Sequence, residues 1–146
     1  MREILFRGKR IKDGAWIEGN LLTGRWYLNG RPITAISPVD NVFFPHCEIS
    51  EYEEVIPETV GQYTGLTANG KKIFEGDILA HWNEEQEKYT GKCVVKYGEF
   101  NCSCCDGVYG WYLDGGDIRF IDEGDSHYEV IGNIHDNREL LEVNNG

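Results

Sequence analysis

Residues 62–79, QYTGLTANGKKIFEGDIL, carry the strongest fold signal in the chain. Asn69-Gly70 supplies the positive φ angles of a two-residue hairpin turn. Aromatic and β-branched residues flank this turn, which is typical of two paired strands. Gly76-Asp77 predicts a second sharp turn, because glycine lets the chain reverse and aspartate bonds nearby backbone amides. The stretch therefore predicts a hairpin, a sharp turn and a further strand, as in many small SH3-like barrels.

The same turn chemistry recurs along the rest of the chain. An Asp or Asn precedes a Gly at Asp13-Gly14, Asn29-Gly30, Asp106-Gly107 and Asp114-Gly115. Short runs rich in β-branched and aromatic residues lie between these turns, and we expect strands at residues 4–6, 15–17, 26–28, 33–36, 78–82, 92–97, 108–113, 117–121 and 128–134. Short strands with turn signals at this spacing predict a β-sandwich or small barrel.

Helical signals are confined to the end of the chain. Asn137 is a candidate cap, and residues 137–141 predict one short terminal helical turn. Three prolines between residues 37 and 58 make the middle of the chain loop-like. We therefore predict a mostly β fold with two parts, an N-terminal β-hairpin lobe over residues 1–58 and a C-terminal SH3-like β-barrel over residues 59–146.

The composition is that of an acidic globular protein. The 146 residues include 14 Lys and Arg against 25 Asp and Glu, a net charge of −11. The 18 glycines exclude a coiled coil or helical bundle. Residues 1–31 hold seven basic and three acidic residues, a net charge of +4, which leaves −15 for the remainder. One interpretation is that this charge asymmetry steers partners or aligns two copies of the chain head to tail. The alternative is that the charged residues lie on solvated strand faces.

The sequence predicts a cytoplasmic location. Charged residues interrupt the first apolar run at once, so we expect no signal peptide. No apolar stretch approaches the roughly 20 residues of a membrane helix. The five cysteines are an odd number, which favours reduced thiols over a disulfide framework.

The cysteine-rich stretch at residues 101–106 raises the question of a metal site. Thiolates and imidazoles are good zinc ligands, and the candidate ligands here are Cys93, Cys102, Cys104, Cys105 and His127, with His135 as a substitute. The paired Cys-x-x-Cys knuckles of structural zinc sites are missing, so free thiols near a hairpin tip are the competing interpretation. We predict no cofactor.

An acidic run spans residues 114–129. It lacks the spacing of an EF-hand calcium loop. The run is either an ordinary solvated face or an imitation of the phosphate charge of DNA that occupies a DNA-binding protein. The shortage of clustered basic residues disfavours direct nucleic-acid binding.

The sequence also lacks a recognisable catalytic signature. It contains no nucleophile elbow, phosphate loop or His-Glu-x-x-His motif, so no catalytic residue is predicted. The four Trp and eight Tyr allow two interpretations, since SH3-like grooves display aromatics to proline-rich ligands and small β domains pack them in the core. We expect Trp16 and Trp111 in the core.

Three ordered segments resemble the YopX family of phage and prophage proteins. They are the opening residues 2–9, REILFRGK, the stretch at residues 62–79 with its Tyr-Thr-Gly-Leu, Asn-Gly-Lys and Glu-Gly-Asp-Ile pieces, and the closing residues 129–141, EVIGNIHDNRELL. The resemblance implies a mostly β protein with an SH3-like C-terminal barrel. It carries over no catalytic residue, and the middle and cysteine-rich stretches are less typical of the family.

These observations lead to one main functional prediction. We expect a non-enzymatic phage or prophage protein that acts through contacts with a host or phage protein in the bacterial cytoplasm, with self-association as an alternative. A second alternative is an acidic DNA mimic or a nucleic-acid-associated accessory protein. A third is a small enzyme whose site the sequence does not reveal.

Overall fold

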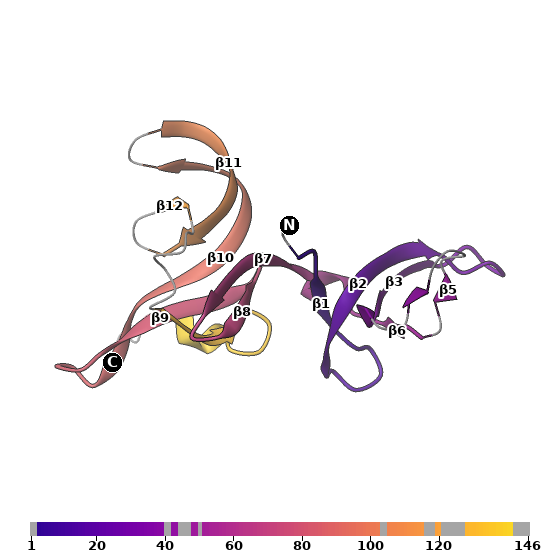
Figure 1. Ribbon diagram of the computed structural model, residues 1–146, viewed down its shortest axis with the longest axis horizontal. Helices are drawn as coiled ribbons and strands as arrows, with labels where there is room; N and C mark the ends of the chain where they lie inside the picture. Colours follow the sequence, from indigo (N-terminus) through magenta and orange to yellow (C-terminus); the bar gives the residue numbers. More distant parts are fainter. Residues whose placement is uncertain are drawn as a thin grey trace. The chain divides into compact units, whose positions relative to one another are not determined.

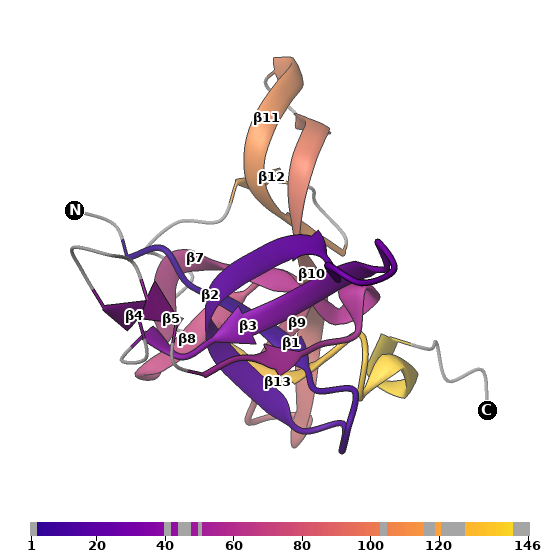
Figure 2. The ribbon, with the colours of Figure 1, turned by 90° about the vertical axis from the view of Figure 1, so that its right-hand side faces the viewer.

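The computed structural model describes residues 3–39, 42–43, 48–49, 51–102, 105–115, 119–120 and 128–141. It is built almost entirely of antiparallel strands (Figures 1 and 2). The strands are β1 (Phe6–Lys9), β2 (Trp16–Arg25), β3 (Pro32–Ser37), β4 (Val42–Phe43), β5 (Glu48–Ile49), β6 (Glu53–Glu54), β7 (Gly61–Ala68), β8 (Lys71–Phe74), β9 (Asp77–Asn83), β10 (Lys88–Cys102), β11 (Cys105–Asp114), β12 (Arg119–Phe120) and β13 (Glu129–Asn133). The prediction of a mostly β protein is confirmed.

Helical structure in the described residues consists of short 3-10 turns. Among them are η2 (Pro57–Thr59) and η4 (Arg138–Leu141), the latter near the end of the chain. The Leu140 amide donates to the Asn137 carbonyl oxygen at 2.9 Å as η4 begins. The predicted terminal helical turn is therefore confirmed. Within the part of the chain that the structure describes, no helix is long and apolar enough to cross a membrane.

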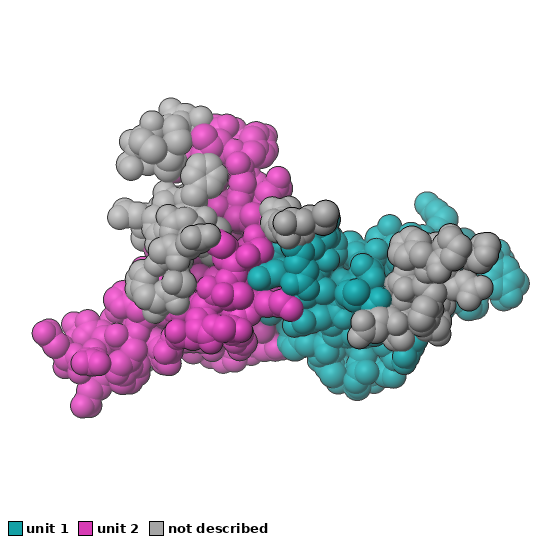
Figure 3. All heavy atoms as spheres, viewed as in Figure 1, with its two compact units in different colours: residues 1–63 teal, residues 64–146 magenta. Residues whose placement is uncertain are grey.

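The chain forms two compact units, Met1–Tyr63 and Thr64–Gly146 (Figure 3). The division falls within β7, whose first residues pair with β1 while the strand order continues to β8. The boundary expected from the sequence lies slightly earlier, between Glu58 and Thr59 in η2, and stays a prediction.

Unit 1 holds strands in the order β6-β3-β2-β1-β7. Strand β2 is shared between two partners: residues 16–19 pair with β1 and residues 20–25 pair with β3. Gly19 lies at the changeover, where a Cβ atom would overlap the backbone carbonyl of Ser37. Only glycine permits this close approach of backbones, which holds β2 in register where its partner changes.

Turn chemistry explains the hairpins, although the loop lengths differ from expectation. Asn69 and Gly70, with φ angles of 51° and 77°, form the predicted two-residue turn between β7 and β8. Asn29-Gly30 closes a longer loop, because the Trp26 amide donates to the Arg31 carbonyl at 2.8 Å. The Asn29 side chain instead accepts the Arg31 amide at 2.9 Å, an Asx turn inside the loop.

The two-residue interpretation is also wrong at two other dipeptides. Asp13-Gly14 lies in a longer loop, which is closed by the Arg10 amide donating to the Ala15 carbonyl at 2.8 Å. Asp106-Gly107 lies inside β11, and the β10–β11 hairpin reverses before it. The side chain of Asn101 accepts the Gly107 amide at 2.8 Å, so this glycine with φ 66° is accommodated within the ribbon.

Unit 2 holds a five-stranded sheet in the order β12-β11-β10-β9-β13. Its core consists of Ala68, Ile73, Leu79, Cys93, Val95 and Leu113, with Leu66, Trp111, Tyr128 and Val130 packed against it. The order of the described strands is open, since β12 and β13 lie at opposite edges. A closed SH3-like barrel is therefore not shown.

The β10–β11 ribbon continues beyond β9 and curves along its length (Figures 1 and 2). Gly98 and Gly110 lie opposite each other in this ribbon, with φ angles of 147° and 155°. Residues with a side chain rarely adopt such angles. The facing glycines therefore permit a local bend in both strands.

The Gly76-Asp77 turn is built as the sequence predicts. Gly76 has φ 90°, and the Asp77 carboxylate accepts the amide of Phe74 at 2.8 Å. Asp77 and Phe74 are both buried. The Gly76 carbonyl accepts the Ile134 amide at 2.9 Å, which ties the turn to the end of β13.

We expect Asp77→Ala to lower the free energy of unfolding by about 1–3 kcal/mol, because it leaves the buried Phe74 amide without its carboxylate acceptor. Urea denaturation measures the change. Asp13→Ala is the matched control, since Asp13 also accepts a backbone amide, that of Ala15 at 3.0 Å, but in an exposed loop. Equal losses in the two variants would show that burial of the Asp77 bond is not what matters.

Candidate functional site

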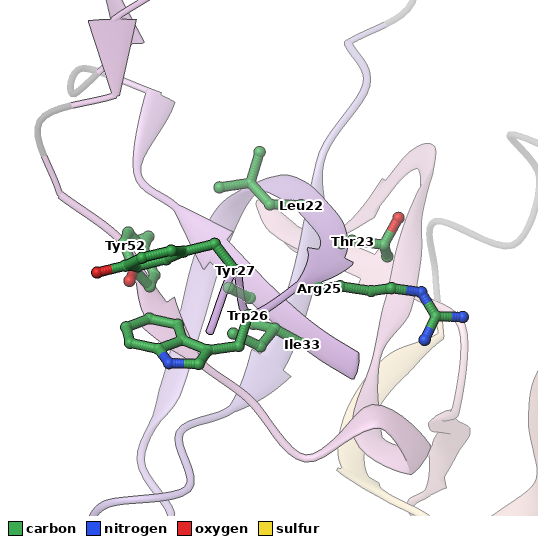
Figure 4. A pocket seen from close by; sticks show the side chains of 9 residues that line it. Leu22, Thr23, Arg25, Trp26, Tyr27, Ile33 and Tyr52 are labelled. Carbon is green, nitrogen blue, oxygen red and sulfur yellow. The ribbon is translucent and has the colours of Figure 1, made fainter. Parts of the chain in front are cut away.

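A pocket of about 330 Å³ lies in unit 1 over the ends of β2 and β3 (Figure 4). The β2–β3 register places Leu22 opposite Ala35 and Gly24 opposite Ile33, so these residues lie on one face of the sheet. Tyr52 reaches the same region from the segment before β6. The lining residues are Leu22, Thr23, Gly24, Arg25, Trp26, Tyr27, Ile33, Ala35 and Tyr52.

Three aromatic rings give the pocket its character. Figure 4 shows Trp26, Tyr27 and Tyr52 gathered on one side, with Ile33 beside Trp26. The rings of Trp26 and Tyr27 are tilted against each other at a centroid distance of 5.6 Å. Trp26 is 37% exposed, Tyr52 50% and Tyr27 84%. Large aromatic rings left this accessible offer apolar area and a polar tip to a partner.

Gly24 keeps the floor of the pocket open. A Cβ atom added at Gly24 meets no heavy atom within 4 Å, and its backbone conformation lies outside the region reserved for glycine. Glycine usually weakens a strand interior. Its position between Leu22 and Trp26 therefore creates space rather than relieving backbone strain.

An ion pair borders the pocket on the same face. The Arg31 guanidinium donates to the Glu54 carboxylate at 2.7 Å, and Glu54 lies directly opposite Ala35. This hydrogen bond lowers the pKa of Glu54 and raises the pKa of Arg31. The two charges neutralise each other, so the described face of the pocket is mainly apolar.

Arg25 differs from Arg31 in its direction and its partner. Figure 4 shows its side chain, like that of Thr23, pointing away from the three rings. The Arg25 guanidinium donates to the Gly30 carbonyl oxygen at 3.2 Å. In the described part of unit 1 it has no carboxylate partner, so no described acidic group offsets its charge beside the end of β2.

The structure describes only some of the candidate zinc ligands. Cys93 is buried in the core of unit 2, where its thiol donates to the Leu79 carbonyl at 3.7 Å. Cys102 and Cys105 lie opposite each other in the β10–β11 register, whereas Cys104 and His127 lie outside the described residues. The described residues contain no group of three metal-ligating side chains. A zinc site stays a prediction for the remainder.

The other aromatic residues divide between core and surface. Trp111 packs against the core of unit 2 but is only half-buried. Trp16 is also half-buried, with the Arg7 guanidinium 4.7 Å from its ring centroid. The expectation of core positions is therefore confirmed only in part, since Trp111 packs against the core of unit 2 whereas Trp16 is half-buried beside Arg7. Trp82 and Tyr89 form an exposed pair on β9 and β10, in which the Tyr89 hydroxyl donates to Glu129 at 2.6 Å.

The sequence pattern alone does not single out the pocket. It predicts a strand at residues 26–28, and this prediction is wrong, because β2 ends at Arg25 and these residues lie in the loop before β3. A usable signal is nevertheless present, because three large apolar residues at 26–28 directly precede the Asn29-Gly30 turn. Large apolar residues at a hairpin tip have no interior to enter, which predicts exposure.

Comparisons with known proteins give a family and a similar solved structure. A family model described as YopX protein matches residues 5–142. The chain is also similar to the crystal structure of protein EF1440 from Enterococcus faecalis, with 26% identity and a TM-score of 0.55. That similarity covers 97% of this chain and 100% of the other. No curated protein matches the chain.

We expect Arg31→Gln to raise the pKa of Glu54, since the hydrogen bond from Arg31 is the main cause of its lowering. Carboxyl-carbon NMR titration measures the shift. Because the folded-state pKa of Glu54 lies below its unfolded value, the pair stabilises the fold above the unfolded pKa. This contribution is lost as the pH falls through the folded pKa.

Lys12→Gln provides the control for this titration. It removes the neighbouring ion pair between Lys12 and Glu53, whose atoms lie 2.8 Å apart, and leaves Arg31 in place. An unchanged Glu54 titration in Arg31→Gln, or an equal rise in Lys12→Gln, would contradict the assignment.

Proposed function

The chain belongs to the YopX family, and from this premise we propose that it is a non-enzymatic phage or prophage protein that acts through protein contacts in the bacterial cytoplasm. The names YopX protein and EF1440 state no activity. The bacterial source of EF1440 supports a bacterial setting. The molecular role therefore rests on the geometry of this chain.

The aromatic pocket of unit 1 is the observation that carries the proposal. Trp26, Tyr27 and Tyr52 surround an open apolar space, and Gly24 leaves its floor free. Interfaces are enriched in Trp and Tyr, and a few such side chains carry most of the binding energy. An open apolar groove lined by rings fits a side chain of another protein better than it fits a reaction that requires exclusion of water.

The family resemblance also supports an architecture for unit 2. We infer an SH3-like barrel over residues 59–146, supported by the five antiparallel strands and the sharp turn at Gly76-Asp77. In this proposal unit 2 is the scaffold, and unit 1 presents the pocket.

The acidic surface of unit 2 favours a second candidate function. Glu84, Glu85 and Glu87 are all exposed in the turn between β9 and β10, next to the Trp82–Tyr89 pair. Such a surface suits a basic partner, including a DNA-binding protein that a DNA mimic would occupy. Direct binding of nucleic acid stays disfavoured, and we assign no residue to an enzymatic alternative.

Capture from a nuclease-treated lysate of phage-infected bacteria tests the proposal. The immobilised full chain is compared with Gly24→Val, which fills the pocket, and with Thr34→Val, which keeps the volume of a half-buried β3 residue that does not line it. We expect wild type and Thr34→Val to retain the same proteins, and Gly24→Val to lose them about tenfold. Thermal melts establish that all three fold.

The salt dependence separates the two candidate functions. Contacts made by apolar rings persist at high salt, whereas contacts between exposed charges are screened. Proteins that Gly24→Val retains fully, and that elute as salt rises, would favour the acidic surface and contradict the pocket. A column that retains no protein would contradict a stable host or phage partner.

A further inference from the structure

Beyond Gly19, one edge of β2 has no strand partner in the part of the chain that the structure describes. Strand β1 pairs with β2 only as far as Phe6 opposite Gly19. Beyond this point β2 continues through residues 20–25, paired with β3 on its other side. The outer edge of residues 21–25 therefore presents backbone groups that no described strand meets.

The hydrogen-bond alternation identifies which groups face this edge. The Trp26 amide donates to the Arg31 carbonyl, so in an uninterrupted register the pairs that are hydrogen-bonded to β3 continue at Gly24 and Leu22. Arg25 lies opposite Pro32, which has no amide to donate, as expected for a pair without mutual hydrogen bonds. The amides and carbonyls of Leu21, Thr23 and Arg25 consequently point outward.

Residues 22–25 of β2 both line the pocket and form part of the open edge. Side chains of a strand alternate between its two faces. A strand that paired with the outer edge would therefore place every second side chain over Leu22, Gly24 and the Trp26 ring. The side chains between them would lie on the opposite face, beside Thr23 and Arg25.

The charges on these two faces differ. On the pocket face Arg31 is neutralised by Glu54. On the other face the Arg25 guanidinium has only the Gly30 carbonyl as a described partner. An added strand is thus met by apolar rings on one face and by an unneutralised cation on the other. The complementary segment alternates apolar and acidic residues.

We propose that the outer edge of β2 binds an extended segment of a partner protein by strand addition, with apolar side chains entering the aromatic pocket and acidic side chains facing Arg25. Main-chain hydrogen bonds supply affinity in this recognition mode, and the alternating side chains supply specificity. The inference rests on the proposed function of the pocket as a protein-contact site, and it defines the chemistry of the partner.

Selection from a random peptide library on the full chain tests this chemistry. The probe is a displayed peptide of about seven residues, long enough to span the open edge at ~3.3 Å per residue. We expect enriched sequences to alternate apolar and acidic residues, and Arg25→Glu to enrich apolar and basic alternation instead. Enrichment of sequences without alternation, or no enrichment, would overturn the proposal.

Backbone pairing is tested separately with an enriched peptide. Thr23→Pro removes an outward amide and should weaken binding about tenfold, whereas Thr23→Val keeps that amide and should weaken binding far less. Amide exchange at Leu21, Thr23 and Arg25 should slow on binding in the wild type. This measurement stands even where the proline variant does not fold, and unchanged exchange at all three amides would overturn strand addition.

The Gly24→Val variant distinguishes a failure of the strand-addition proposal from a failure of the proposed function of the pocket. Peptides that Gly24→Val loses but Thr23→Pro keeps would leave the pocket as a contact site and reject strand addition. Peptides that bind Gly24→Val as well as wild type would reject both.

Discussion

The antiparallel pairing of β2 with β3 is the constraint on which the candidate site depends. It runs without a bulge from Asn20 opposite Ser37 to Arg25 opposite Pro32. This register puts Leu22 and Gly24 on one face with their partners on β3. A slip by one residue would turn every side chain to the other face and remove the pocket. Gly19, which lets the Ser37 backbone approach closely, holds the register where β2 leaves β1.

The same pairing explains why the site combines two kinds of recognition. The rings of Trp26, Tyr27 and Tyr52 supply apolar area. The β2 backbone beyond Gly19 supplies outward hydrogen-bonding groups, which would align an added strand along β2. Exposed strand edges are normally protected by charge or proline because they invite aggregation. Arg25 lies at this end of β2, where its charge restricts which strand can add. The edge is thus selective as well as open.

In unit 2, the turn that contains the buried Asp77 positions residues of the apolar core. Asp77 is buried and accepts the Phe74 amide, and this turn precedes Ile78 and Leu79, both fully buried. The acidic residues of the β9–β10 turn, in contrast, are exposed. The YopX family model spans residues 5–142 and so includes residues of both units.

The β class, the Asn69-Gly70 turn, the Asp77 turn and the family could all be predicted from the amino-acid sequence, because each depends on local backbone chemistry or on ordered motifs. The sequence pattern misjudged the loops at Asp13-Gly14 and Asn29-Gly30, where side chains of Asp13 and Asn29 bond the backbone and lengthen the turn. Only the tertiary structure decided which aromatic residues form the pocket and which edge of β2 stays open. Both depend on which strands pair and in what register, and non-local pairing leaves little trace in a single sequence.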